Sequence, residues 1–116
     1  MRAMKLLVLF LLLSSRVVAM ENVMLPQARK LALEAAEKLY HHNFGDLVVE
    51  DNGVVAKADG WIIIPVSKKY AETHDDLFMI LGGVAFYVKK NGAILQIPAS
   101  VISGGTIDEY INEHSE

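Results

Sequence analysis

Cysteine is absent from this chain of 116 residues. Its absence excludes disulfide bonds, thiol nucleophiles, thiolate metal sites and the attachment of a lipid to a cysteine. Stability must therefore come from side-chain packing. A chain of this length buries only about 60 to 65 % of the surface that its unfolded state exposes, so it supports one domain with one small core. We expect little room for an internal catalytic cleft.

Clusters of basic residues are also lacking. After residue 19, adjacent basic residues occur only as Arg29 with Lys30, Lys68 with Lys69 and Lys89 with Lys90. These pairs are too few for the basic stripe that a phosphate backbone requires, so we expect no nucleic-acid partner. The formal net charge of −3 would become −6 without residues 1–19, which carry three basic residues and no acid. An acidic surface can steer a basic partner, although this balance is also ordinary for a soluble domain.

The first nineteen residues have the three-part layout of a secretory signal peptide. Basic residues at positions 2 and 5 precede an apolar run over residues 6–13, and a small-residue exit ends at Ala19. We expect cleavage after Ala19, which leaves residues 20–116 as a single periplasmic or secreted domain. The run is shorter than the roughly 20 residues of a membrane span, so we expect no stable span after cleavage. Translation from Met20 would instead give a cytoplasmic protein, and this alternative stays open.

The pattern after the signal predicts an α+β fold, with an N-terminal helix packed on an antiparallel meander sheet of four to five strands and a short C-terminal helix. The first helix spans residues 27–42, with an apolar stripe of Ala28, Leu31, Ala32, Ala35 and Leu39. Predicted strands cover residues 47–50, 54–57, 61–66, 84–89 and 93–98. Asp59 and Gly60 favour a turn that tolerates positive φ. Thr106 opens the last helix, where Ile107, Tyr110, Ile111 and His114 share one face.

Asn91 and Gly92 predict a two-residue hairpin with a type I′ turn. In that register Val88 lies opposite Leu95 and Phe86 opposite Ile97 on a core face. Tyr87 then lies opposite Gln96 on a wetter face. The strand at residues 61–66 is apolar on both sides, so it should be central, with Trp61 as a core anchor and an incompletely paired end at Pro65.

The connection over residues 67–83 is too long for a meander turn, and such segments are often functional. We expect a short helical turn at residues 77–81 before Gly82 and Gly83. The connection also holds the densest group of chemically active side chains: Glu72, His74, Asp75 and Asp76. Neighbours on one loop seldom converge on a substrate, so we expect no catalytic site, although a small hydrolase remains an alternative. The four histidines lack metal-ligand spacing, and we expect neither a metal nor a cofactor.

Protein binding fits these features better, and five residues are the candidate contacts: Tyr70, Glu72, Asp75, Asp76 and Tyr87. Tyrosine is a favoured interface anchor, and the acids lie on the long connection. Tyr87 is included because the predicted register places it on the wetter hairpin face.

The order of several motifs resembles the immunity protein 35 family, which includes the YrhB-like proteins. Gly60-Trp61 leads an apolar strand, residues 67–73 read S-x-K-Y-x-E-T, residues 88–92 form a Lys-Asn-Gly turn, and residues 107–111 read I-x-E-Y-I. The resemblance covers about half the chain. Gly82-Gly83-Val84-Ala85 departs from the Gly-Asn-x-Pro-like segment common in that family. The Gly-Gly-Val strand start is also similar to immunity proteins of the NTF2-like fold.

The resemblance implies a small protein that binds and blocks a cognate polymorphic toxin and protects the producing cell. It implies no catalytic residues. Most relatives look cytosolic, whereas this chain carries an apparent export signal, so we expect the toxin or effector to act in the cell envelope. A periplasmic chaperone-like or structural binding domain is the alternative.

Overall fold

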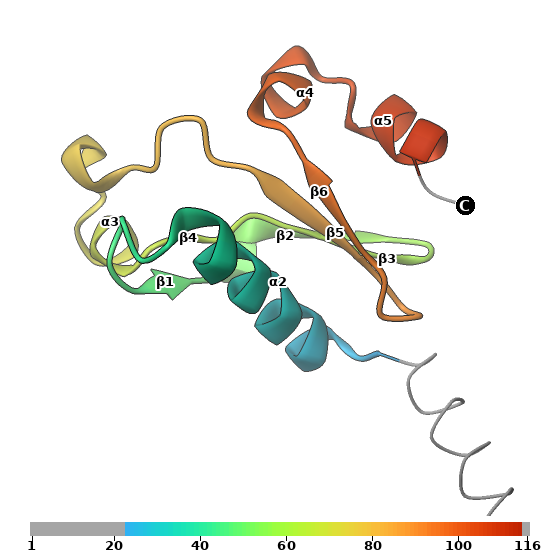
Figure 1. Cartoon of the computed structure of the whole chain (residues 1–116), viewed down its shortest axis with the longest axis horizontal. Helices are drawn as coiled ribbons and strands as arrows, with labels where there is room; N and C mark the ends of the chain where they lie inside the picture. The colour runs from blue at the N-terminus through green and yellow to red at the C-terminus, as the bar shows by residue number, and fades with distance from the viewer. Residues whose placement is uncertain (1–22, 115–116) are drawn as a thin grey trace, which may run out of the picture.

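The computed structural model describes residues 23–114 and has an α+β architecture (Figure 1). Four antiparallel strands form a sheet in the order β2 (Val54–Lys57), β3 (Gly60–Ile63), β5 (Ala85–Lys89) and β6 (Ile94–Ile97). Helix α2 (Leu25–Tyr40) packs on one face, and α4 (Ala99–Gly104) and α5 (Ile107–His114) pack on the other. The predicted fold class is confirmed. The expected export signal lies outside the described residues.

Helix α2 contacts the sheet through a stripe of small residues. Ala28, Ala32 and Ala36 are fully buried at four-residue spacing, and they share a core cluster with Ile63 and Phe86. Alanine side chains let the helix axis approach the sheet closely. Leu39 belongs to the predicted stripe but is 38 % exposed, because the buried face is centred on the three alanines.

The two ends of α2 explain its length. Gln27 accepts a hydrogen bond through Oε1 from the N–H of Met24 at 2.9 Å, so the helix begins at Leu25, two residues before the predicted start. At the other end His41 adopts a left-handed conformation with φ of 51°, and its N–H bonds to the Glu37 carbonyl. Left-handed caps of this kind end a helix by satisfying its last carbonyls.

The hairpin between β5 and β6 has a different loop from the one predicted. Lys89 N–H donates to the Ala93 carbonyl at 2.8 Å, and Gly92 N–H donates to the Lys89 carbonyl at 2.9 Å. Gly92 has φ of 91°, whereas Asn91 is not among the residues with positive φ. The loop therefore has three residues, a turn followed by a glycine bulge, which the same Asn-Gly pair also suits.

This loop shifts the predicted register by one residue. Tyr87 lies opposite Leu95, Phe86 opposite Gln96 and Val88 opposite Ile94. The predicted pairs were therefore wrong. A one-residue slip moves the whole of the partner strand to the other face, so Leu95 and Ile97 join Tyr87 on the face that α4 and α5 cover.

The apolar segment after Gly60 divides into two strands rather than one. Strand β3 ends at Ile63, and Val66–Ser67 forms β4, which pairs with β1 (Leu47–Val48) as a separate two-stranded sheet. Pro65 lies in the break, since it has no N–H for a ladder. The predicted first strand thus stays outside the main sheet, whereas Trp61 is half-buried against the core as predicted.

Gly60 is part of strand β3, and its φ is not positive. A Cβ at this position would lie 2.2 Å from the Val88 carbonyl oxygen and 2.8 Å from the Lys89 Cα. Close approach of strand β5, rather than turn conformation, therefore requires glycine here.

The predicted C-terminal helix is present as α5, and α4 precedes it as an additional helix. Ile107, Tyr110 and Ile111 pack with Val101 against the second core cluster, whereas His114 is exposed and stacks on the Tyr110 ring at 4.0 Å. Among residues 23–114, no helix is long and apolar enough to cross a membrane.

Candidate functional site

The long connection between β4 and β5 folds into α3 (Lys68–Thr73) and the 3-10 helix η2 (Asp76–Phe78). The expected turn over residues 77–81 therefore begins one residue earlier and ends at Phe78, and α3 was not predicted. The signal for α3 is Ser67, whose Oγ accepts from the Tyr70 N–H at 3.0 Å and caps the helix.

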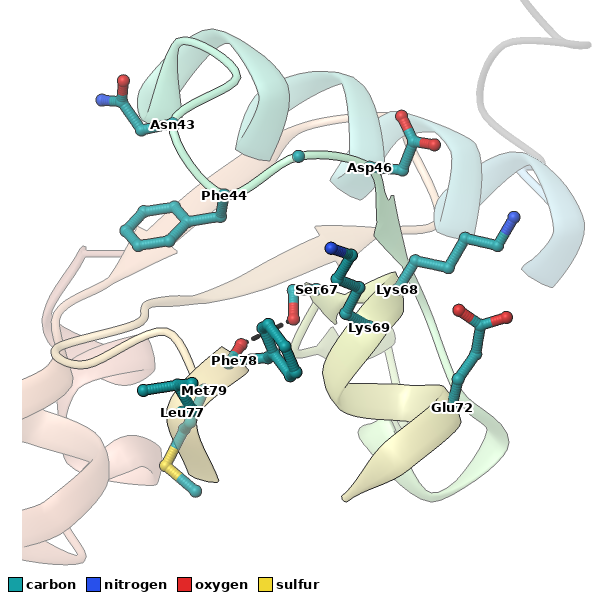
Figure 2. Close-up of a pocket in the computed structure, with 11 residues that line it drawn as sticks. Asn43, Phe44, Asp46, Ser67, Lys68, Lys69, Glu72, Leu77, Phe78 and Met79 are labelled. Atoms are coloured by element: carbon teal, nitrogen blue, oxygen red, sulfur yellow. Dashed lines mark hydrogen bonds between the residues drawn. The ribbon is translucent and has the colours of Figure 1, made fainter. Parts of the chain in front are cut away.

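A groove lies between this connection and the loop that follows α2 (Figure 2). Its volume is about 650 Å³, and its lining comes from residues 43–46, 67–69, Glu72 and 77–79. Segments more than twenty residues apart in the sequence thus form one depression. Backbone contact joins them, because the Lys68 N–H donates to the Asp46 carbonyl at 2.8 Å.

Ser67 fixes the two helical segments of the connection relative to each other. Its side chain is buried at 3 % exposure, and its hydroxyl donates to the Phe78 carbonyl at 2.6 Å, drawn as a dashed line in Figure 2. The same oxygen accepts from the Tyr70 N–H. One hydroxyl therefore joins the start of α3 to the end of η2 and shapes the groove between them.

Tyr40 holds the far end of the connection. Its hydroxyl accepts from the Val84 N–H at 3.1 Å, and its ring meets the Phe44 ring edge-on with centroids 5.2 Å apart. The connection is thus attached at Phe78 and at Val84, and Gly82 between them has φ of 69°.

Large apolar side chains lie in the groove and next to it along the chain, and we refer to this set as the apolar rim: Phe44, Leu77, Phe78 and Met79, which line the groove, and Leu81, which follows Met79 by two residues. Phe78 is half-buried, and the other four are exposed. Leu77 is 82 % exposed and Leu81 is 84 % exposed. Phe44 and Met79 are each 39 % exposed. Single exposed apolar residues are ordinary, but several around one depression are typical of an interaction surface.

Charged side chains occupy the opposite side of the groove. In Figure 2, Asp46, Lys68 and Glu72 lie on one side, and Phe44, Leu77 and Met79 lie on the other. The ion pairs found among residues 23–114, Arg29 with Asp51 and Lys57 with Asp108, involve none of the groove residues. The groove therefore has an apolar half and a charged half whose carboxylates form no ion pair with any side chain of residues 23–114.

The structure brings four of the five predicted contact residues to this end of the molecule. Glu72 lines the groove, and Tyr70 is half-buried on α3, with its ring edge-on to that of His74. Asp75 caps η2 by accepting from the Leu77 N–H at 2.9 Å, and Asp76 is exposed on η2.

The expected exposure of Tyr87 is wrong. Tyr87 is 4 % exposed and belongs to the core cluster with Ile62 and Ile97, beneath α4 and α5. Burial raises the pKa of its phenol above the ordinary value of 10.0; the nearby Asp59 raises the pKa further, and Lys57 lowers it. The alternation of the sequence correctly placed Tyr87 on the face of the sheet opposite helix α2. That face is not exposed, however, because α4 and α5 cover it.

Two of the four chemically active residues on the connection, His74 and Asp75, have local structural roles. His74 ends α3 in a left-handed conformation with φ of 56°, and the Asp75 carboxylate caps η2. No group of three or more histidine and acidic side chains in the described part of the chain could hold a metal ion.

The sequence did not predict several residues of the groove and the apolar rim. Phe44 and Asp46 follow α2, and nothing in their spacing relates them to residues 77–79. Leu77, Met79 and Leu81 belong to an apolar run, which is as typical of a core segment as of a binding surface. The only sequence feature that pointed to an exposed run was its position in an unusually long connection, directly before two glycines.

A second, shallower hollow of about 320 Å³ lies at the end of α2, lined by Glu34, Glu37, Lys38, His41 and His42. His41 is the residue that ends α2. Both histidines have positive φ. Their side chains do not form part of the groove.

No family model, curated protein or solved structure matches this chain. The resemblance to the immunity protein 35 family therefore rests on the motif residues alone. The geometry of the groove and the chemistry of its lining are the basis for a functional proposal.

Proposed function

We propose that this protein is an immunity-type inhibitor that binds a bacterial toxin or effector in the cell envelope and neutralises it through the groove and the apolar rim. The observation that carries the proposal is the 82 % exposure of Leu77 in the lining of a groove of about 650 Å³, and Leu81, four residues further along the same connection, is 84 % exposed. Both leucines lie on the long connection that the sequence singled out.

Burial of these side chains by a partner would be favourable. Covering a leucine contributes about 1.5 to 3 kcal/mol, so two leucines with the partly exposed Phe44 and Met79 form a substantial anchor. Inhibition by occlusion needs no chemistry, only a complementary surface of about 800 Å² on each side. The groove, the apolar rim and the neighbouring α3 are the surface that we propose for this contact.

The predicted polar contacts support the same surface. Glu72 lies in the groove, and Asp75 and Asp76 immediately precede Leu77. Partly apolar centres with polar surroundings are typical of protein interfaces. Tyr87 has no place in the proposed contact, because it is buried beneath α4 and α5.

A protection assay tests the proposed function. The product of the adjacent open reading frame would be expressed in the envelope of a sensitive bacterium with and without this chain. We expect growth to stop without the chain and to recover with it, and the two proteins to co-purify in a fixed ratio. Absence of both protection and binding would contradict the proposal. Binding to many unfolded proteins would favour the chaperone-like alternative.

The proposed location in the cell envelope depends on the expected signal peptide over residues 1–19. Processing after Ala19 and translation from Met20 both give a protein that begins at Met20, so N-terminal sequencing alone does not separate them. Cell fractionation does: we expect the protein in the periplasm or the medium. A protein confined to the cytoplasm would place the target there.

A further inference from the structure

The groove and its approach carry an excess of carboxylates. Two of these line the groove and two stand just before the apolar rim: Asp46, Glu72, Asp75 and Asp76. All four residues are exposed. Asp75 uses one oxygen to cap Leu77, and none of the four forms an ion pair within residues 23–114.

The two lysines in the groove do not neutralise these acids. Lys69 places its Nζ 5.3 Å from the centroid of the Phe78 ring, a cation–π contact at the boundary of the apolar half. Lys68 extends away from that half in Figure 2. Four carboxylates and two ammonium groups leave an excess negative charge of two around the groove.

This charge disfavours two of the possible occupants of the apolar rim. A second copy of the chain meeting the first rim to rim would bring Asp75 and Asp76 of both copies together, and like charges in close contact oppose association. An anionic lipid surface would meet the same repulsion. A partner that covers Leu77 and Leu81 must instead bring positive charge beside its apolar side chains.

We infer that the partner segment seated in this groove is amphipathic and basic, with apolar side chains against Leu77 and Leu81 and lysine or arginine side chains near Glu72 and Asp76. This inference rests on the proposed function, which it extends by naming the chemistry of the contact. Apolar burial supplies most of the affinity, while the carboxylates select the sign of the partner's charge and speed its approach.

Two synthetic amphipathic peptides of equal length, one of leucine and lysine and one of leucine and glutamate, serve as probes. Binding is followed by fluorescence anisotropy and by amide NMR shifts. We expect the leucine–lysine peptide to bind more tightly and to shift amides at residues 44–46 and 77–81. Equal or tighter binding of the leucine–glutamate peptide, shifts confined to other surfaces, or no binding of either peptide would overturn the inference.

Matched charge variants locate the selectivity. The double variant Glu72→Gln/Asp76→Asn should weaken binding of the leucine–lysine peptide about three- to tenfold, as expected for two exposed ion pairs, and should reduce its salt dependence. Glu109→Gln/Glu113→Gln makes the same charge change on exposed positions of α5 and should leave the affinity unchanged. Equal weakening by both double variants would mean that only net charge acts, and the inference would fail.

These results separate the inference from the proposed function. If the leucine–glutamate peptide shifted the groove amides and bound as tightly as the leucine–lysine peptide, the groove would still be a protein-binding site, but it would have no preference for basic partners. Failure of toxin protection together with intact peptide selectivity would remove the proposed function and leave the inference. Amide NMR shifts in the groove that change with protein concentration in the absence of peptide would identify a second copy of the chain as the occupant. Binding to vesicles of anionic lipid would identify a lipid surface. Either result would overturn the inference.

Discussion

At the scale of single residues, Ser67 has the strongest link between fold and groove. It is buried, and its hydroxyl joins the Tyr70 N–H to the Phe78 carbonyl. Loss of the hydroxyl leaves two half-buried backbone groups without this partner. The groove wall and the stability of the domain therefore depend on the same oxygen atom.

Ser67→Ala should lower the free energy of unfolding by about 1 to 3 kcal/mol, since it removes a helix cap and a buried hydrogen bond. Chemical denaturation measures the change. Ser103→Ala is the matched control, because Ser103 is exposed and its hydroxyl lies 3.4 Å from the Ser100 carbonyl. Equal effects of the two substitutions would show that Ser67 does not hold the connection.

Gly60→Ala should destabilise the domain by about 1 to 3 kcal/mol or more, because its Cβ would overlap the Val88 carbonyl oxygen at 2.2 Å. Thermal or chemical unfolding provides the measurement. At Gly104 the nearest atom to a new Cβ is the Thr106 Oγ1 at 3.9 Å, so Gly104→Ala should be neutral or slightly stabilising. An unchanged stability for Gly60→Ala would contradict the close approach of β3 and β5.

The buried Tyr87 predicts a pH dependence at alkaline pH. Burial, the largest cause, raises its pKa above 10.0 in the folded state. The folded protein then holds the phenol proton more tightly than the unfolded chain, so this stability is complete below pH 10 and is lost as pH rises through the raised pKa. Denaturation from pH 8 to pH 11 should show a steeper loss for the native chain than for Tyr87→Phe. Parallel curves would disprove this assignment.

At the scale of elements, helix α2 and strand β5 form the main packing contact. The three buried alanines face Ile63, Phe86 and Val88, all of which are at most 2 % exposed. Protein interiors have little free volume. A helix that packs on a sheet through alanines must therefore move away from the sheet if one of these alanines is replaced by a larger residue.

Ala32→Leu should therefore reduce the free energy of unfolding by about 1 to 3 kcal/mol through overpacking. The control is Glu34→Leu, which adds the same side chain at an exposed position of the same helix and should change stability by less than about 0.5 kcal/mol. Both are measured by chemical denaturation. If Ala32→Leu were as stable as Glu34→Leu, the alanine stripe would not set the helix–sheet distance.

Local sequence features predicted most elements, but long-range placement decided the details. The apolar stripe from Ala28 and the cap region at Thr106 identified α2 and α5, because helix periodicity is a local property. The register between β5 and β6 was missed because Asn-Gly fits both a two-residue and a three-residue loop. Tyr87 was misplaced because coverage of the second face depends on where α4 and α5 dock.

At the scale of the whole molecule, the candidate site lies at one end of the domain and away from both helices that cover the second face (Figure 1). The sequence identified the long connection, and Glu72 and Asp76 within it. It did not reveal that Phe44 and Asp46 complete the groove, since their proximity comes from the turn after α2 and the pairing of β1 with β4. The fold therefore combines the long connection with the turn after α2 into one groove, which the sequence of the connection alone does not predict.

Binding of the adjacent gene product to the native chain and to Leu77→Asp/Leu81→Asp, measured by isothermal titration calorimetry, tests the central claim most directly. Met24→Asp is the control, because Met24 is 66 % exposed and precedes α2, where an acid is a favourable cap. We predict tight one-to-one binding that weakens at least about a hundredfold in the double variant and stays unchanged in the control. Undiminished binding by a folded double variant would contradict the claim that the apolar rim is the contact surface.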